Sequence, residues 1–136
     1  MRPLLLLVTL LLLFIANSRG QIQQPGGSPQ WMKTVLGEAT QFVKGKALYK
    51  ANCASCHKPD RDFTGPPLAG ATKRYSREWL YRFIHNPSLM VETDLLAKAV
   101  AYQWRPTIMT GFPQLENSAI DAILHYADYA ASGKVK

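Results

Sequence analysis

The feature that most constrains this chain is the run Cys53-Ala54-Ser55-Cys56-His57, which holds the only two cysteines of the sequence. Two thiols stand three residues apart, and a histidine follows the second directly. This pattern is the attachment signature of haem c. Thiols at this spacing reach the two vinyl groups on one edge of a porphyrin, and the next residue is held under the iron. The chain is therefore expected to fold around a large flat group.

Three other kinds of site use similar residues. A structural zinc site needs four ligands, and neither His85 nor His125 stands at a zinc-finger spacing from the run. A redox-active thiol pair of the thioredoxin type follows a strand in a βαβ pattern, and no strand is expected before Cys53. A disulfide between the two cysteines is possible in an oxidising compartment, but it would leave His57 without a role. The sequence favours covalently bound haem.

The N-terminal residues have the pattern of a secretory leader. Residues 4–16 are apolar apart from one threonine and follow an arginine. They are too few for a membrane span, which needs about 20 apolar residues, and they match the apolar core of a signal peptide. Small residues place cleavage after Ser18 or Gly20. We predict a signal peptide over 1–20, a flexible, Pro- and Gly-rich N-terminal segment over 21–36, and an exported, periplasmic chain without a membrane span after cleavage.

Length and charge exclude several classes of protein. Removing 20 residues from 136 leaves 116, which is one domain and too few for a dinucleotide-binding domain plus a substrate domain. Loss of Arg2 and Arg19 with the leader lowers the net charge from +7 to +5. The positive charge is not gathered into one tract, so it favours an acidic protein partner or an anionic surface over nucleic acid.

Helical spacing of apolar residues predicts an all-α domain over 37–136. Apolar residues recur at intervals of three and four, and no sustained period-two alternation is present. Ser76 suits a helix N-cap, and the pair Asn86-Pro87 ends the helix that Ser76 begins. The expected helices begin near Ala39 and run from Ser76 to Ile84, from Leu89 to Tyr102 and from Asn117 to Ala131.

Between Phe42 and Tyr129 the chain resembles a class I, monohaem cytochrome c, in particular the small bacterial electron-transfer type. Gly45 and Tyr49 precede the Cys-His run where the family has a glycine and an aromatic residue at the crossing of its first and last helices. The matching C-terminal positions are Ile123 and Tyr126. The resemblance implies a cytochrome c fold, with four to five helices wrapped around one haem bound through both cysteines.

The resemblance also implies roles for residues around the cofactor. His57 would be the proximal iron ligand, and the carbonyl of Pro66 would bind its other ring nitrogen, which fixes the ring and raises its basicity. Arg74 stands at the family's usual place for a cation near a haem propionate, with a solvated surface position as the alternative. Trp79 and Thr107 are further candidates for propionate bonds, and core packing is the alternative for Trp79.

The sixth iron ligand is expected to be Met109. It lies in a loop shortly before the last helix, with an aromatic residue three positions later, where the family places its axial methionine. Met90 stands at the start of a helix and is expected to be core filler. His85 and His125 could replace Met109 in principle, but single histidines on helices are usually surface or packing residues. The predicted metal ligands are His57 and Met109.

These ligands imply a one-electron carrier rather than an enzyme, because both axial positions of the iron are filled. A dedicated haem subunit of a periplasmic oxidoreductase complex is the alternative, and a gas-binding or peroxide-reducing haem protein is a further one that requires Met109 not to bind iron. The expected partner is an acidic oxidase, reductase or dehydrogenase. Lysines near the run are the candidate docking residues: Lys44, Lys46, Lys50 and Lys58.

Overall fold

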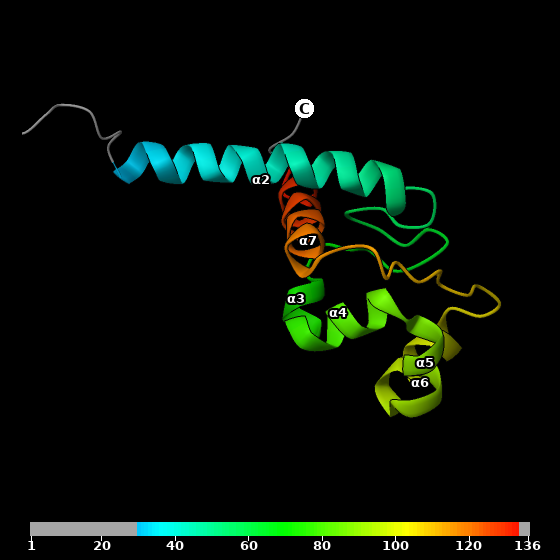
Figure 1. Cartoon of the computed structure of the whole chain (residues 1–136). Helices are drawn as coiled ribbons and strands as arrows, with labels where there is room; N and C mark the ends of the chain where they lie inside the picture. Colours follow the sequence, from blue (N-terminus) through cyan, green and yellow to red (C-terminus); the bar gives the residue numbers. More distant parts are fainter. Residues whose placement is uncertain (1–29, 134–136) are drawn as a thin grey trace, which may run out of the picture. The chain divides into compact units, whose positions relative to one another are not determined.

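The computed structural model of the chain describes residues 30–133. The predicted leader, 1–20, and residues 21–29 lie outside the described residues, and residues from 31 onward form one compact unit. The described part contains helices and no strand (Figure 1), which confirms the all-α class, and none of its helices is long and apolar enough to span a membrane. The helices are α2 (Gln30–Asn52), α3 (Ala71–Arg74), α4 (Arg77–His85), α5 (Pro87–Thr93), α6 (Leu95–Gln103) and α7 (Asn117–Ala131).

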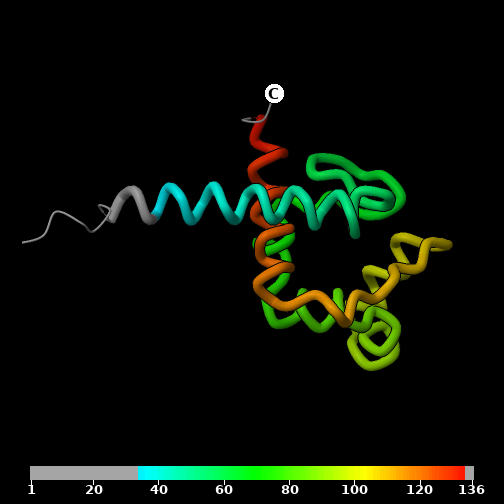
Figure 2. The backbone as a smooth tube through the Cα atoms, turned by 45° about the horizontal axis from the view of Figure 1, so that its top comes forward, coloured from blue at the N-terminus to red at the C-terminus, as the bar shows by residue number. Residues whose placement is uncertain are grey.

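The first and last of these helices, α2 and α7, cross at Gly45 (Figures 1 and 2). A Cβ atom on Gly45 would overlap the carbonyl group of Ala122 and lie 3.0 Å from Cβ of Tyr126. The ring of Tyr49 packs on that of Tyr126, with 5.2 Å between centroids. The close crossing therefore requires glycine. Of the two expected C-terminal positions, Tyr126 lies at the crossing, and the nearest atoms of α7 are those of the Ala122 backbone carbonyl.

Helix α2 begins at Gln30, well before the expected start near Ala39. Residues 30–36 of the predicted flexible segment are therefore helical. Val35 and Leu36 are 55% and 58% exposed, so this first part of the helix has little apolar burial. A helix segment that buries little apolar surface needs no apolar residues at intervals of three and four. The sequence pattern therefore could not reveal this part of the helix.

The predicted helix over 89–102 is wrong: it is two helices, α5 and α6, that meet at Asp94. The backbone of Asp94 is extended, and its carboxylate accepts hydrogen bonds from the Ala97 N–H (2.9 Å) and from Nε1 of Trp79 (3.2 Å). Ser76 caps α4 as expected and accepts from the Trp79 N–H at 3.2 Å. Helix α3 was not expected, because four residues are too few to show a helical period.

Helix α7 has the predicted bounds and supports the other elements. Its Asp121 forms an ion pair with Arg77 of α4 and accepts from the Tyr81 hydroxyl at 2.9 Å. Its Asp128 accepts from the Gly70 N–H at 2.6 Å. These bonds attach both α4 and the loop before α3 to one rigid helix.

Candidate functional site

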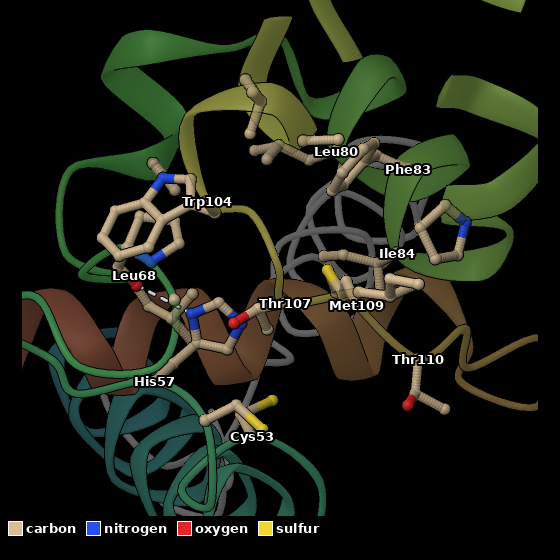
Figure 3. Close-up of a pocket in the computed structure, with 18 of the residues that line it drawn as sticks. Cys53, His57, Leu68, Leu80, Phe83, Ile84, Trp104, Thr107, Met109 and Thr110 are labelled. Carbon is tan, nitrogen blue, oxygen red and sulfur yellow. Dashed lines mark hydrogen bonds between the residues drawn. The ribbon is translucent and has the colours of Figure 1, made fainter. Parts of the chain in front are cut away.

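A cavity of about 1000 Å³ lies beside the Cys-His run. Residues of the end of α2, the loop that follows it, helices α3 to α7 and the loop between α6 and α7 form its wall. The volume is at the upper end of the range for small-molecule sites, about 300–1,000 Å³. Most of the lining side chains labelled in Figure 3 are apolar or aromatic. The apolar residues of the wall include Leu68, Leu80, Phe83, Ile84, Ile123 and Leu124.

One wall of the cavity is a stack of three aromatic rings, Tyr75, Trp79 and Phe83, spaced four residues apart. The ring centroids of Tyr75 and Trp79 lie 4.6 Å apart, and those of Trp79 and Phe83 lie 4.8 Å apart, with planes only 9° from parallel. Such a stack presents a continuous apolar surface to the cavity. Trp79 is buried, and its Nε1 donates to Asp94 rather than pointing to a free acceptor. The structure thus gives Trp79 a buried packing position and a bond to Asp94, and its contact with a haem propionate stays a prediction.

The turn after α2 brings Cys53, Cys56 and His57 to the cavity. The backbone N–H groups of Cys56 and His57 both donate to the carbonyl of Cys53, at 3.1 and 2.8 Å. No disulfide joins the two cysteines, so both sulfur atoms are available for thioether bonds. Burial raises the pKa of the Cys53 thiol to about 11, with a smaller contribution from Cys56, so Cys53 is a neutral thiol at pH 7.

The His57 ring is oriented by the segment that follows it. Its Nδ1 lies 2.8 Å from the carbonyl oxygen of Pro66, as the resemblance implied. Because a carbonyl oxygen only accepts, Nδ1 carries the proton and the lone pair is on Nε2. The Tyr49 hydroxyl donates to the His57 carbonyl at 2.6 Å, and burial, the largest of several causes, raises the pKa of this phenol, which keeps it a donor. His57 is therefore held by both its ring and its backbone, with a nitrogen free to bind a metal.

Arg74 braces the loop that contains Pro66. Its guanidinium donates to the carbonyls of Pro67 at 2.8 Å and Ala69 at 2.9 Å. The resemblance placed this residue near a propionate, and it does line the cavity. The bonds that the structure gives it, however, go to the loop backbone. Arg74 thus binds the loop whose Pro66 carbonyl contacts His57, and its contact with a haem propionate stays a prediction.

The loop between α6 and α7 brings Thr107 and Met109 to the same cavity (Figure 3). Among the described residues that line it, His57 is the one histidine and Met109 the one methionine. Met90 is only 5% exposed and belongs to the core. His125 is exposed on α7.

Two residues near the site escaped the sequence analysis. The Trp104 indole lines the cavity (Figure 3), although its position just after a helix gave no periodic signal. His85, considered only as a possible iron ligand, has its Nε2 2.7 Å from the carbonyl of Leu115. That contact joins residues 30 positions apart, so no local pattern could predict it.

The residues of the cavity fit a covalently attached haem. The sulfur atoms of Cys53 and Cys56 and the oriented imidazole of His57 lie along one part of a large apolar cavity. The side chain of Met109 reaches the same cavity from a second segment. Within the described residues, no group of three or more His, Cys, Asp or Glu could hold a bare metal ion.

Comparisons with known proteins agree on one family. The family model of cytochrome c matches residues 42–129. A cytochrome c from Rhodothermus marinus is 28% identical, with a TM-score of 0.59 over 70% of this chain and 80% of that one. An engineered cytochrome c from the same organism is 25% identical, with a TM-score of 0.57 over 83% and 91%. A cytochrome c domain from Pseudomonas putida, 24% identical with a TM-score of 0.53 over 65% and 88%, shares the fold. A search of curated proteins gave no match.

Proposed function

Because this chain belongs to the cytochrome c family, with haem c attached through Cys53 and Cys56, we propose that it carries single electrons on a six-coordinate iron whose axial ligands are His57 and Met109. The observation that carries this proposal is the cavity itself. His57 and Met109 both line it, from loops more than fifty residues apart in the sequence. Met90 is buried in the core.

The residues around the cavity support electron transfer over substrate chemistry. When bound, the haem supplies an iron that changes between the ferrous and ferric states. His57 and Met109 together fill both axial positions, which excludes oxygen or peroxide, and this pair gives a higher potential than two histidines. The apolar wall acts in the same direction, because it disfavours the additional charge of the ferric state. The Pro66 carbonyl partly offsets this rise in the reduction potential, since its bond to Nδ1 makes His57 a stronger donor to the iron.

Export and an acidic partner complete the proposal. The leader pattern over residues 1–20 supports export to the periplasm, which is where thioether attachment would take place. The basic net charge supports docking on an acidic oxidase, reductase or dehydrogenase. The exposed Lys44 and Lys50 on α2 are available for such contacts.

Replacing Met109 tests the ligand assignment. Met109→Ala should keep the haem attached, abolish the ferric charge-transfer band of histidine–methionine ligation, lower the potential and allow rapid binding of cyanide and carbon monoxide. Absorption spectra, potentiometric titration and stopped-flow mixing measure these effects.

Met90→Ala is the matched control. It removes a buried side chain and should lower the free energy of unfolding by about 2–5 kcal/mol, while the charge-transfer band remains. If Met109→Ala keeps the band and binds cyanide no faster than the wild type, the ligand assignment is wrong. A wild-type protein that lacks the band and binds cyanide as fast as Met109→Ala would instead indicate a five-coordinate, gas-binding site.

A further inference from the structure

The segment around Met109 is anchored only at its two ends. Among the described residues, the nearest backbone N–H groups on either side that donate to a backbone carbonyl belong to Thr107 and Phe112. Thr107 donates to Trp104 at 2.9 Å, within the same loop, whereas Phe112 donates to the Ile84 carbonyl of α4, also at 2.9 Å. The contact on the C-terminal side therefore decides where the segment lies relative to the rest of the cavity.

His85 makes a second bond to the same part of the loop. Its Nε2 lies 2.7 Å from the carbonyl oxygen of Leu115. That oxygen only accepts, so Nε2 carries the proton. The Leu115 N–H donates to the Phe112 carbonyl at 3.1 Å, and Leu115 itself is buried. Residues 112–115 therefore form a turn that is bonded to the end of α4 at both of its ends, by Ile84 and by His85.

Gly111 shows how closely the loop lies on this helix end. A Cβ atom at this position would be 2.8 Å from the carbonyl oxygen of His85 and 3.0 Å from Cδ of Pro87. The first distance is shorter than a real Cβ contact, and its partner is backbone. The last carbonyls of a helix need partners outside the helix, and here the loop supplies one of them.

We propose that His85 is a positioning residue for Met109: its ring fixes the turn over 112–115 on the end of α4 and thereby holds the thioether at the iron. This inference rests on the proposed function, in which Met109 is the sixth ligand. His85 is not among the residues that line the cavity, so it would act only through the loop. Without its bond the turn keeps one attachment, and the thioether spends more time away from the metal.

The test uses the haem-loaded protein and three histidine variants. His85→Leu removes the donor, His85→Gln keeps an amide donor, and His125→Leu changes an exposed histidine of α7 as the matched control. One readout is the hydrogen-exchange rate of the Phe112 amide, which reports on the turn. The other is the rate of cyanide binding to the ferric protein, which reports how often the sixth position opens.

His85→Leu should raise both rates by roughly two- to tenfold, the range expected when one hydrogen bond is lost. His85→Gln should restore most of the wild-type behaviour, and His125→Leu should change neither rate. Gly111→Ala displaces the loop from the same helix end by a different route. It should also speed cyanide binding, and it keeps the proposal testable if His85→Leu does not fold.

Met109→Ala, measured in parallel, separates two kinds of failure. If Met109→Ala opens the sixth position but His85→Leu and Gly111→Ala bind cyanide at the wild-type rate, the role of His85 is refuted and the proposed ligand stands. If Met109→Ala does not open the position, the ligand assignment fails, and the role of His85 fails with it.

Discussion

The orientation of the His57 ring depends on a residue without a side chain. A Cβ atom on Gly65 would lie 2.6 Å from Cε1 and 3.0 Å from Nδ1 of His57. The next residue, Pro66, supplies the carbonyl that accepts the Nδ1 proton. Gly65 thus permits the close approach that makes this hydrogen bond possible.

We predict that Gly65→Ala displaces the His57 ring and weakens its bond to Pro66. The protein should lose about 1–3 kcal/mol of stability, the usual cost of overpacking. Its reduction potential should also rise, because an imidazole without the carbonyl contact is a poorer donor to the iron. Denaturant titration and potentiometry measure the two effects. A variant with the wild-type potential would show that the Pro66 contact does not tune the iron.

At the scale of elements, one helix contains two glycines in opposite surroundings. Gly45 faces the backbone of α7 at the helix crossing, whereas nothing lies within 4 Å of a Cβ atom on Gly37. Both positions are in the interior of α2. The pair therefore separates the cost of the crossing from the intrinsic cost of glycine in a helix.

Gly37→Ala should stabilise the protein by about 0.5–1 kcal/mol, because alanine loses less backbone entropy than glycine in a helix. Gly45→Ala has the same advantage in backbone entropy, but its Cβ atom would overlap the Ala122 carbonyl. It should therefore destabilise the protein by about 1–3 kcal/mol. Thermal unfolding of both variants measures this. Equal effects of the two substitutions would contradict the close crossing of α2 and α7.

At the scale of the whole molecule, the lysines near the Cys-His run are not equivalent. The Lys58 ammonium lies 3.2 Å from the Ala54 carbonyl and 4.4 Å from the centroid of the Phe63 ring. Changing Lys58 would therefore disturb the loop as well as the charge. Lys50, in the last turn of α2, is exposed and only three residues from Cys53. It is the cleaner probe of electrostatic docking near the cofactor.

We predict that Lys50→Glu slows electron transfer to an acidic partner severalfold at low salt, and that the difference from the wild type shrinks as salt is added, since the Debye length is about 10 Å at 0.1 M. Lys44→Glu makes the same change of charge about 9 Å further along the helix and should slow transfer less. Second-order rate constants across a salt series measure both. Rates that do not depend on salt would remove the docking proposal and leave the electron-carrier proposal intact.

The sequence by itself determined the class of fold, the cofactor and the bounds of α7. The spacing in Cys53–His57 and the period of apolar residues are local, so they can be identified without coordinates. Even the contact between Pro66 and His57 was predicted, since the resemblance fixed it through residues nine positions apart.

Only the tertiary structure decided what depends on distant partners. Asp94 divides a predicted helix because its carboxylate accepts hydrogen bonds both from the Trp79 indole and from the Ala97 N–H at the start of α6. The backbone carbonyl of Ala122 lies against Gly45 because the packing of α2 on α7 sets where the two helices cross. The bond from His85 to Leu115 exists because the loop before α7 lies on the end of α4. A hydrogen bond between residues far apart in the chain leaves no period in the sequence, so such contacts had to come from the fold.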